Sequence, residues 1–372
     1  MNYTLFLFLF LIGSHYLNEL VLIPFLLFFG LRKQIKIKLR QVDQVYFIAV
    51  ILLILYSFIQ KGLKFDIGLC IHFLLLFFLV FFIKDEKFSL GHLLIVIKSF
   101  LIFSLLIFLY NAFLNDFQFG FIKALSIPRF QGIFREPSIA SFNFLLFGVI
   151  LFSYDKAKIS FWVLLCLFFI LVTFSGSGYI LLLITALSYI KFKITKRRLL
   201  ITLSILIVTS LVSIALVNTE GYQKLVSKRL SRVSSGDDNS SKLRFLAPLQ
   251  AAEFTMLDSP AFGFGIGTSE SVIDENRSFF TLFELFDGEE TTKVNNIYAL
   301  IILYGGFFLI AVHFLLIYSL GRKINYENRP IYVLFLFFPF FSGFYVDIFF
   351  WFLVYFIRHT QNNSLQSNNG LS

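Results

Sequence analysis

Long runs of apolar residues recur from one end of the chain to the other, separated by short polar segments. A helix needs roughly 20 apolar residues to cross about 30 Å of hydrocarbon. Barrel strands would instead alternate polar and apolar positions, and stretches such as 71–83 and 331–338 do not alternate. Because only helices and closed barrels satisfy their backbone groups in lipid, the pattern predicts an all-α, polytopic transmembrane helix bundle of about 10–12 spans.

The continuity of the first and last predicted spans is open, since each could be one tilted helix or two short helices with a break. Glu19 and Asp347 lie within these two spans, where a charge is costly unless it faces protein or a wet cavity. Each could make a polar contact between helices or act directly in chemistry. The predicted spans are residues 4–30, 44–60, 67–83, 93–113, 139–153, 159–175, 178–192, 199–217, 294–319 and 331–357.

Short loops rich in Lys and Arg fix the expected orientation, because such loops stay in the cytoplasm. Loops 31–41, 191–198 and 320–329 are of this kind. Provided that 173–178 is a tight outer turn, even numbers of crossings separate them, and segments 114–138 and 218–293 fall outside. The predicted parts are membrane helices 1–217 with outer loop 114–138, a large extracytoplasmic loop 218–293, membrane helices 294–357 and a disordered tail 358–372.

Composition agrees with an integral membrane protein. The 372 residues are 58% hydrophobic and only 15% charged, against about a quarter charged in soluble domains, and the mean hydropathy is +0.82. The 54 Phe residues are interpreted as the codon usage of an AT-rich genome. Both cysteines lie inside apolar runs, so neither a disulfide nor a metal site is expected.

The first outer loop ends in Arg135-Glu136-Pro137-Ser138 just before a span. Pro at the first helical position and a carboxylate beside it are typical of a helix start, which is the structural interpretation. Arg135 has no such explanation, and a guanidinium there is suited to gripping a phosphate in a bidentate fork.

The second outer loop has a basic arm followed by an acidic remainder. Residues 245–257 predict a short amphipathic helix with Arg244 in its first turn, either as part of a solvated basic face or as a phosphate ligand. The glycines of 263–267 lack the preceding strand of a dinucleotide site and predict a flexible turn that could approach a ligand. Asn295 and Asn296, before Tyr298, could cap the ninth span or position a sugar hydroxyl. The basic residues of the arm are Lys224, Lys228, Arg229, Arg232, Lys242 and Arg244.

Four segments together resemble the O-antigen and capsular polysaccharide repeat-unit polymerases (Wzy-type), of the O-antigen polymerase/ligase superfamily. Residues 132–138 resemble the family's GxFxEPS region, and 173–178 its SRSG turn, with Gly176 in place of the family's Arg. Residues 257–268 are similar to its PxxGxGxG region, and 295–306 to the HNxxL…GG region shared with the ligases. The order agrees over about residues 115–315.

The resemblance implies metal-independent, inverting glycosyl transfer without a cofactor, at the outer leaflet. Its substrates would be a growing glycan and a single repeat unit, both on undecaprenyl pyrophosphate, with a chain-length regulator as a further candidate partner and no nucleic acid. The implied catalytic residues are Arg135, Glu136 and Arg244, with Glu136 a candidate general base. The implied substrate-binding residues are Arg129, Arg229, Arg232, Asn295, Asn296 and Tyr298.

Two alternatives stay open. A flippase or transporter of lipid-linked sugar would carry charges through many spans and internal repeats, and neither is evident. A ligase would have His at the position of Asn295, and an amide cannot remove a proton at neutral pH.

Overall fold

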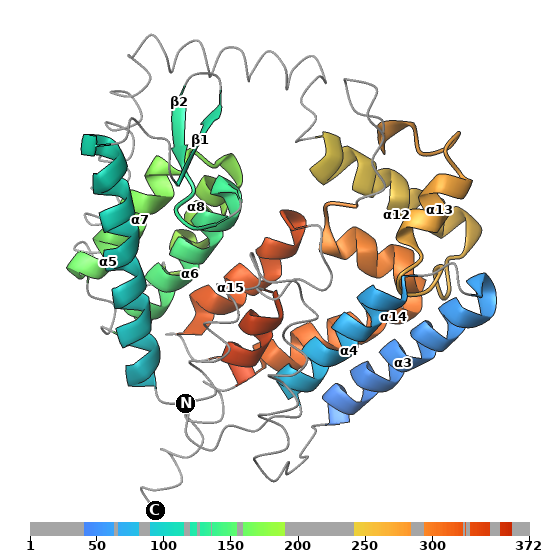
Figure 1. Cartoon of the computed structure of the whole chain (residues 1–372). Helices are drawn as coiled ribbons and strands as arrows, with labels where there is room; N and C mark the ends of the chain where they lie inside the picture. Colours follow the sequence, from blue (N-terminus) through green and yellow to red (C-terminus); the bar gives the residue numbers. More distant parts are fainter. Residues whose placement is uncertain are drawn as a thin grey trace, which may run out of the picture.

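The structure, a computed structural model, is built almost entirely of helices (Figure 1). Within the part of the chain that the structure describes, three helices are long and apolar enough to cross a membrane: α3 (Gln41–Lys61), α5 (Leu90–Leu114) and α14 (Ile297–Gly321). The expectation of an all-α membrane protein is therefore confirmed. The structure describes residues 41–62, 66–81, 90–114, 120–124, 127–134, 136–154, 159–189, 242–283, 294–322, 324, 328–342 and 350–358. The predicted spans 4–30 and 199–217 lie outside the described residues, as do Glu19 and Asp347.

Shorter apolar helices complete the bundle, and one small hairpin joins it. These are α4 (Ile67–Phe81), α6 (Pro137–Tyr154), α7 (Phe161–Val172), α8 (Gly176–Ser188) and α15 (Arg329–Phe337), with a last helical segment at 350–358. The antiparallel hairpin of β1 (Phe121–Ala124) and β2 (Ile127–Phe130) lies in the first predicted outer loop. The second outer loop holds π-helical η2 (Lys242–Leu246), α12 (Ala247–Asp258), α13 (Ser269–Glu275) and the 3-10 turn η3 (Thr281–Phe283).

The helices form two groups with α15 between them (Figure 1). One group holds α5 to α8 and the hairpin, and its centre is α6, which is buried on all sides from Ala140 to Phe147. The other holds α3, α4 and α12 to α14. Along α3 the exposed residues recur at intervals of three and four, as expected for a lipid-facing stripe. These residues are Val45, Ile48, Leu52, Leu55 and Ile59.

Helix α14 is broken within its membrane span. Gly306 adopts φ 52° and ψ −146°, so the N–H groups of the next two residues cannot reach the carbonyls four positions back. The segment 260–267, called here the glycine loop, supplies four replacement hydrogen bonds. Phe307 and Phe308 donate to the Pro260 and Ala261 carbonyls at 2.8 and 3.0 Å, and the Leu303 and Tyr304 carbonyls accept from Phe264 and Gly265 at 2.8 and 2.9 Å. Two lost intrahelical bonds are thus replaced by four to the glycine loop.

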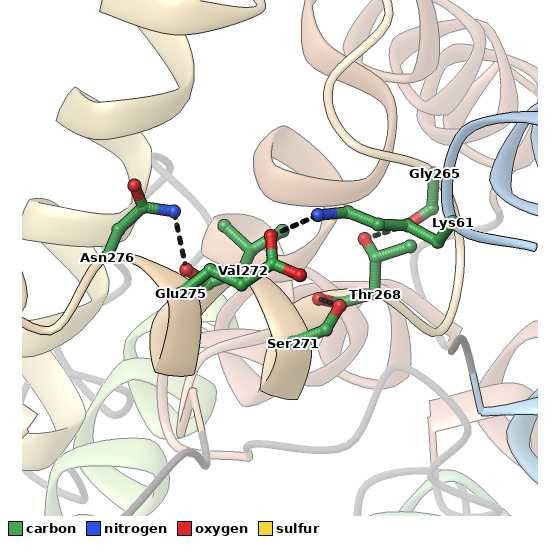
Figure 2. A network of polar contacts seen from close by, with 7 residues as sticks. All are labelled: Lys61, Gly265, Thr268, Ser271, Val272, Glu275 and Asn276. Atoms are coloured by element: carbon green, nitrogen blue, oxygen red, sulfur yellow. Dashed lines mark hydrogen bonds and ion pairs between the residues drawn. The ribbon is translucent and has the colours of Figure 1, made fainter.

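The glycine loop is also fixed to the turn between α3 and α4. The Ser57 hydroxyl donates to the Ile266 carbonyl at 2.9 Å, and the Asp66 N–H donates to the Gly267 carbonyl at 2.9 Å. Lys61, at the end of α3, pairs with Glu275 of α13 (Figure 2). Residues 263–267 do form turns, as the sequence predicts. Hydrogen bonds to α14, to Ser57 of α3 and to Asp66 hold the loop in place.

A buried ion pair ties three helix ends together at the opposite end of α3. Arg358 donates to Asp43 in the first turn of α3 at 2.5 Å and to the Ser319 hydroxyl near the end of α14 at 2.9 Å. The start of α3 and the end of α14 therefore lie at the same end of this helix group, away from the glycine loop. Arg358, where the predicted tail begins, is itself helical and buried.

The last predicted span, 331–357, is not one continuous helix. Helix α15 ends at Phe337, passes into the 3-10 turn η5 (Phe338–Phe340) at Pro339, and leaves helical geometry at Phe341 and Ser342. A proline ring clashes with the carbonyl four residues back and removes one donor. The helical residues 350–358 then return toward Asp43.

We expect Gly306→Ala to unfold the outer half of α14. With ψ −146°, this positive φ lies near the region that is essentially restricted to glycine, so an L residue is strained by about 1–3 kcal/mol. A Cβ at Gly306 would also lie 2.3 Å from the Pro260 carbonyl oxygen. Thermal unfolding in detergent should show a large drop in midpoint. The matched control is Gly176→Ala, because a Cβ at Gly176 meets nothing within 4 Å. Equal midpoints for the two variants would contradict this account of the break.

We expect Asp43→Ala to destabilise the protein by roughly 3 kcal/mol or more, because it leaves the Arg358 guanidinium buried without its carboxylate. The double variant Asp43→Ala/Arg358→Leu should recover part of the loss. Asp274→Ala is the control, since Asp274 and Arg277 form a pair in which the side chains are 57% and 29% exposed, and such surface pairs contribute about 1 kcal/mol or less. A double variant no more stable than the single one would count against the ion-pair explanation.

Candidate functional site

Three segments singled out from the sequence meet at one aromatic turn, residues 338–341. Phe338 packs edge-on against Phe142 of α6 at 5.3 Å between ring centroids. Phe341 packs perpendicular to Phe245 of η2 at 6.1 Å. The third partner is Tyr298, in the first turn of α14, which packs against Phe340. The aromatic turn therefore lies between the start of the large-loop helices and the helix that follows the first outer loop.

Tyr298 attaches the start of α14 to the same turn. Its ring lies 4.8 Å from that of Phe340, and its hydroxyl donates to the Leu336 carbonyl at 2.6 Å. This carbonyl lies at the end of α15, where helix carbonyls lose their intrahelical partners. Tyr298 thus has a structural role, and its predicted contact with substrate stays a prediction.

Glu136 lies directly before α6, as the helix-start interpretation requires. Its carbonyl accepts from the Ala140 N–H at 3.0 Å, and its exposed carboxylate accepts from the Ser138 hydroxyl at 3.1 Å. Pro137 takes the first helical position, where its missing N–H costs nothing. The carboxylate is accessible from outside the bundle, so a role as general base is sterically open to it.

Arg244 lies in η2, the π-helical turn that leads into α12, and is half-buried. The prediction of a helix over 245–257 with Arg244 in its first turn is close to the observed η2 and α12. Pro248 near the start of α12 explains the altered geometry of the turn before it, because proline there has no N–H to donate. The neighbouring Phe245 ring anchors this turn to the aromatic turn.

Asn295 and Asn296 lie in different environments. Asn296 is buried and caps α14, its side-chain oxygen accepting from the Ala299 N–H at 3.2 Å, which is the structural alternative posed by the sequence. Asn295 is half-buried and precedes the helix. Because Asn296 is buried and caps the helix, Asn295 is the better candidate of the two to bind a ligand.

Arg129 holds the β1–β2 hairpin to the turn between α7 and α8. Its Nε donates to the Thr173 carbonyl at 3.2 Å, and Ser175 caps α8 by accepting from the Gly178 N–H at 3.3 Å. The tight turn predicted at 173–178 is therefore present. Arg135, Arg229 and Arg232 lie outside the described residues.

Sequence reasoning missed the aromatic turn as a meeting point. Pro339 within a run of Phe signalled a break in the last span, but nothing in the local pattern indicates which distant rings pack there. No cluster of three or more His, Cys, Asp or Glu suited to a metal ion occurs among the described residues.

Residues 161–314 match the family model described as O-antigen ligase (Wzy_C). The match supports a place in the O-antigen polymerase/ligase superfamily. The matched range runs from α7 into α14 and includes Arg244, the glycine loop and the break at Gly306, but not Glu136. No curated protein sequence gives a significant match.

We expect Tyr298→Phe to cost about 1 kcal/mol, since it removes one hydroxyl bonded to a carbonyl and leaves the ring contacts in place. Tyr318→Phe on the same helix is the control, because the Tyr318 side chain is 64% exposed. Chemical denaturation in detergent would measure both. A Tyr298→Phe variant as stable as Tyr318→Phe would show that the bond to Leu336 contributes nothing.

Proposed function

We propose that this protein is a polysaccharide repeat-unit polymerase that acts on lipid-linked oligosaccharides at the outer leaflet of the cytoplasmic membrane. The donor is a growing glycan on undecaprenyl pyrophosphate, and the acceptor is a single repeat unit on the same lipid. The observation that carries the proposal is the meeting of the Glu136 helix, the Arg244 turn and the start of α14 around the aromatic turn. The superfamily match supports glycosyl transfer between lipid-linked saccharides.

The reaction follows from the chemistry of these groups. An acceptor hydroxyl oxygen forms a bond to the anomeric carbon of the donor glycan, and the bond from that carbon to the pyrophosphate breaks with inversion. The electron pair leaves with the lipid pyrophosphate, and the hydroxyl proton passes to a general base. Positioned cations such as Arg135 and Arg244 lower the barrier by stabilising the charge of the leaving group. Glu136 is the candidate base.

Asn295 favours polymerase over ligase. The resemblance gives ligases a His at this position, and a neutral imidazole can accept a proton near neutral pH, whereas an amide cannot. Asn295 can instead donate and accept hydrogen bonds to a sugar hydroxyl. Its half-buried position before α14 leaves it accessible to such a partner.

The test of the proposal is the glycan length distribution of cells that carry Arg135→Ala or Arg244→Ala. Losing one cation aimed at a leaving group costs roughly 100-fold in rate or more, so long chains should disappear and single units accumulate. Arg277→Ala is the matched control, since Arg277 belongs to the same outer segment and pairs with Asp274. Membrane levels of all three variants are compared by immunoblot.

Normal long chains in both active-site variants would overturn the assignment of the arginines. A strain lacking the protein distinguishes the competing classes. Single repeat units at the outer leaflet indicate a polymerase, and units at the inner leaflet indicate a flippase. Full-length polymer that is not transferred to its final acceptor indicates a ligase.

A further inference from the structure

Helix α12 has two opposed faces, although it belongs to a loop predicted to lie outside the membrane. One face is buried in the protein and consists of Ala247, Pro248, Ala251 and Thr255. The other is exposed and mostly apolar: Leu249 is 66% exposed and Leu257 72%, with Leu246 beside them. Positions 246, 249, 253 and 257 follow the three- and four-residue spacing of one helix face. A water-facing surface would normally carry charges here.

The neighbouring helix α13 provides the contrast within the same segment. Its exposed residues are Glu270, Asp274 and Glu275, and its apolar residues Val272 and Ile273 are buried. Figure 2 shows Glu275 directed toward Lys61 at the end of α3. Helix α13 therefore has the surface of an element in water, and α12 does not.

The turn after α12 continues the apolar surface onto membrane spans. Phe262 is 53% exposed, and its ring lies 6.4 Å from Tyr56 of α3 and 5.7 Å from Phe308 of α14. Tyr56 precedes Lys61 by five residues on α3, which places it about 7.5 Å further along the axis of this apolar helix than Lys61. The exposed Phe262 therefore lies level with the lipid-facing part of two spans, where aromatic rings concentrate at membrane boundaries.

We infer that α12 lies in the outer boundary of the bilayer, with Leu249, Leu257 and Phe262 in contact with the acyl chains of outer-leaflet lipids. The glycine loop fixes the depth, because it joins the end of α12 to the broken backbone of α14. Glu253 lies within the exposed face and keeps the helix at headgroup level. The bilayer lipid is thus the partner that covers this surface.

The position of α12 in the bilayer determines the depth of the residues that precede it. Lys242 and Arg244 lie in η2, four and two residues before Leu246, so they are held near the plane of lipid phosphates. The link to catalysis rests on the proposed function: a pyrophosphate attached to a membrane lipid meets Arg244 at this depth. The lipid contact itself depends only on the exposed face and the ring contacts of Phe262.

Spin labels on single cysteine variants in proteoliposomes test the inference. Leu249→Cys and Leu257→Cys probe the face, Leu52→Cys of α3 is the lipid reference, and Glu270→Cys of α13 is the aqueous reference. The native Cys70 and Cys166 are buried, and the unsubstituted protein measures any labelling of them. Collision with oxygen and with a water-soluble nickel chelate is compared for vesicles of phosphatidylethanolamine and phosphatidylglycerol.

We expect the labels at 249 and 257 to collide with oxygen more than with the chelate, as at position 52, and the label at 270 to show the reverse. Labels at 249 and 257 that resemble position 270 would overturn the inference. Glycan ladders of the unlabelled variants show that each is folded and active. Lipid-exposed labels together with normal chains in both Arg135→Ala and Arg244→Ala leave the interface standing and remove the assignment of the arginines within the proposed function. Aqueous labels together with lost chains in both variants do the opposite.

Discussion

The broken backbone of α14 is the constraint on which the arrangement of residues 242–283 depends. Within hydrocarbon no water is present to bond a free N–H or carbonyl, and each unsatisfied group costs several kcal/mol. The break at Gly306 frees four such groups, and the glycine loop bonds all four. Irregular backbone at membrane depth is tolerated only where protein or a wet cavity surrounds it, so the loop and the span must fold as one unit. Residues 242–283 are consequently a part of the membrane bundle and not a separate domain on a tether.

The same constraint determines how the candidate site is held. The glycine loop joins α12 to α14, Tyr298 joins α14 to the end of α15, and the aromatic turn joins α15 to Phe245 and to Phe142 of α6. Ring contacts and a hydrogen bond to a backbone carbonyl thereby hold together residues that are far apart in the sequence. A preorganised arrangement of this kind is what stabilisation of a departing pyrophosphate requires, since the donors need not reorganise during the reaction.

Sequence alone predicts the helices well and their interruptions poorly. Span 44–60 corresponds to α3 and 294–319 to α14 because long apolar runs have few alternatives in lipid. The break in α14 was not predicted, since a Gly pair is tolerated in a membrane helix and its partners lie some forty residues earlier. The contacts of the glycine loop were not predictable for the complementary reason: glycines indicate positive φ but not which carbonyls the loop will meet. The helix start at Pro137 and the cap at Asn296 were recognisable because both depend on neighbouring residues only.

The buried contacts also separate structural from chemical roles among the polar residues of the outer face. Arg129, Asn296 and Tyr298 each bond a backbone group and so contribute to the fold. The Glu136 carboxylate is exposed and accepts a hydrogen bond from the Ser138 hydroxyl in its own turn. Arg244 is half-buried in η2, just before α12, so its exposure is intermediate between these two kinds of residue. If α12 lies at the lipid boundary, the dielectric around its first turn is well below that of water, and the attraction between a guanidinium and a pyrophosphate is strengthened accordingly. The membrane would then act as part of the site, because it excludes water from the side of α12 that the protein leaves uncovered.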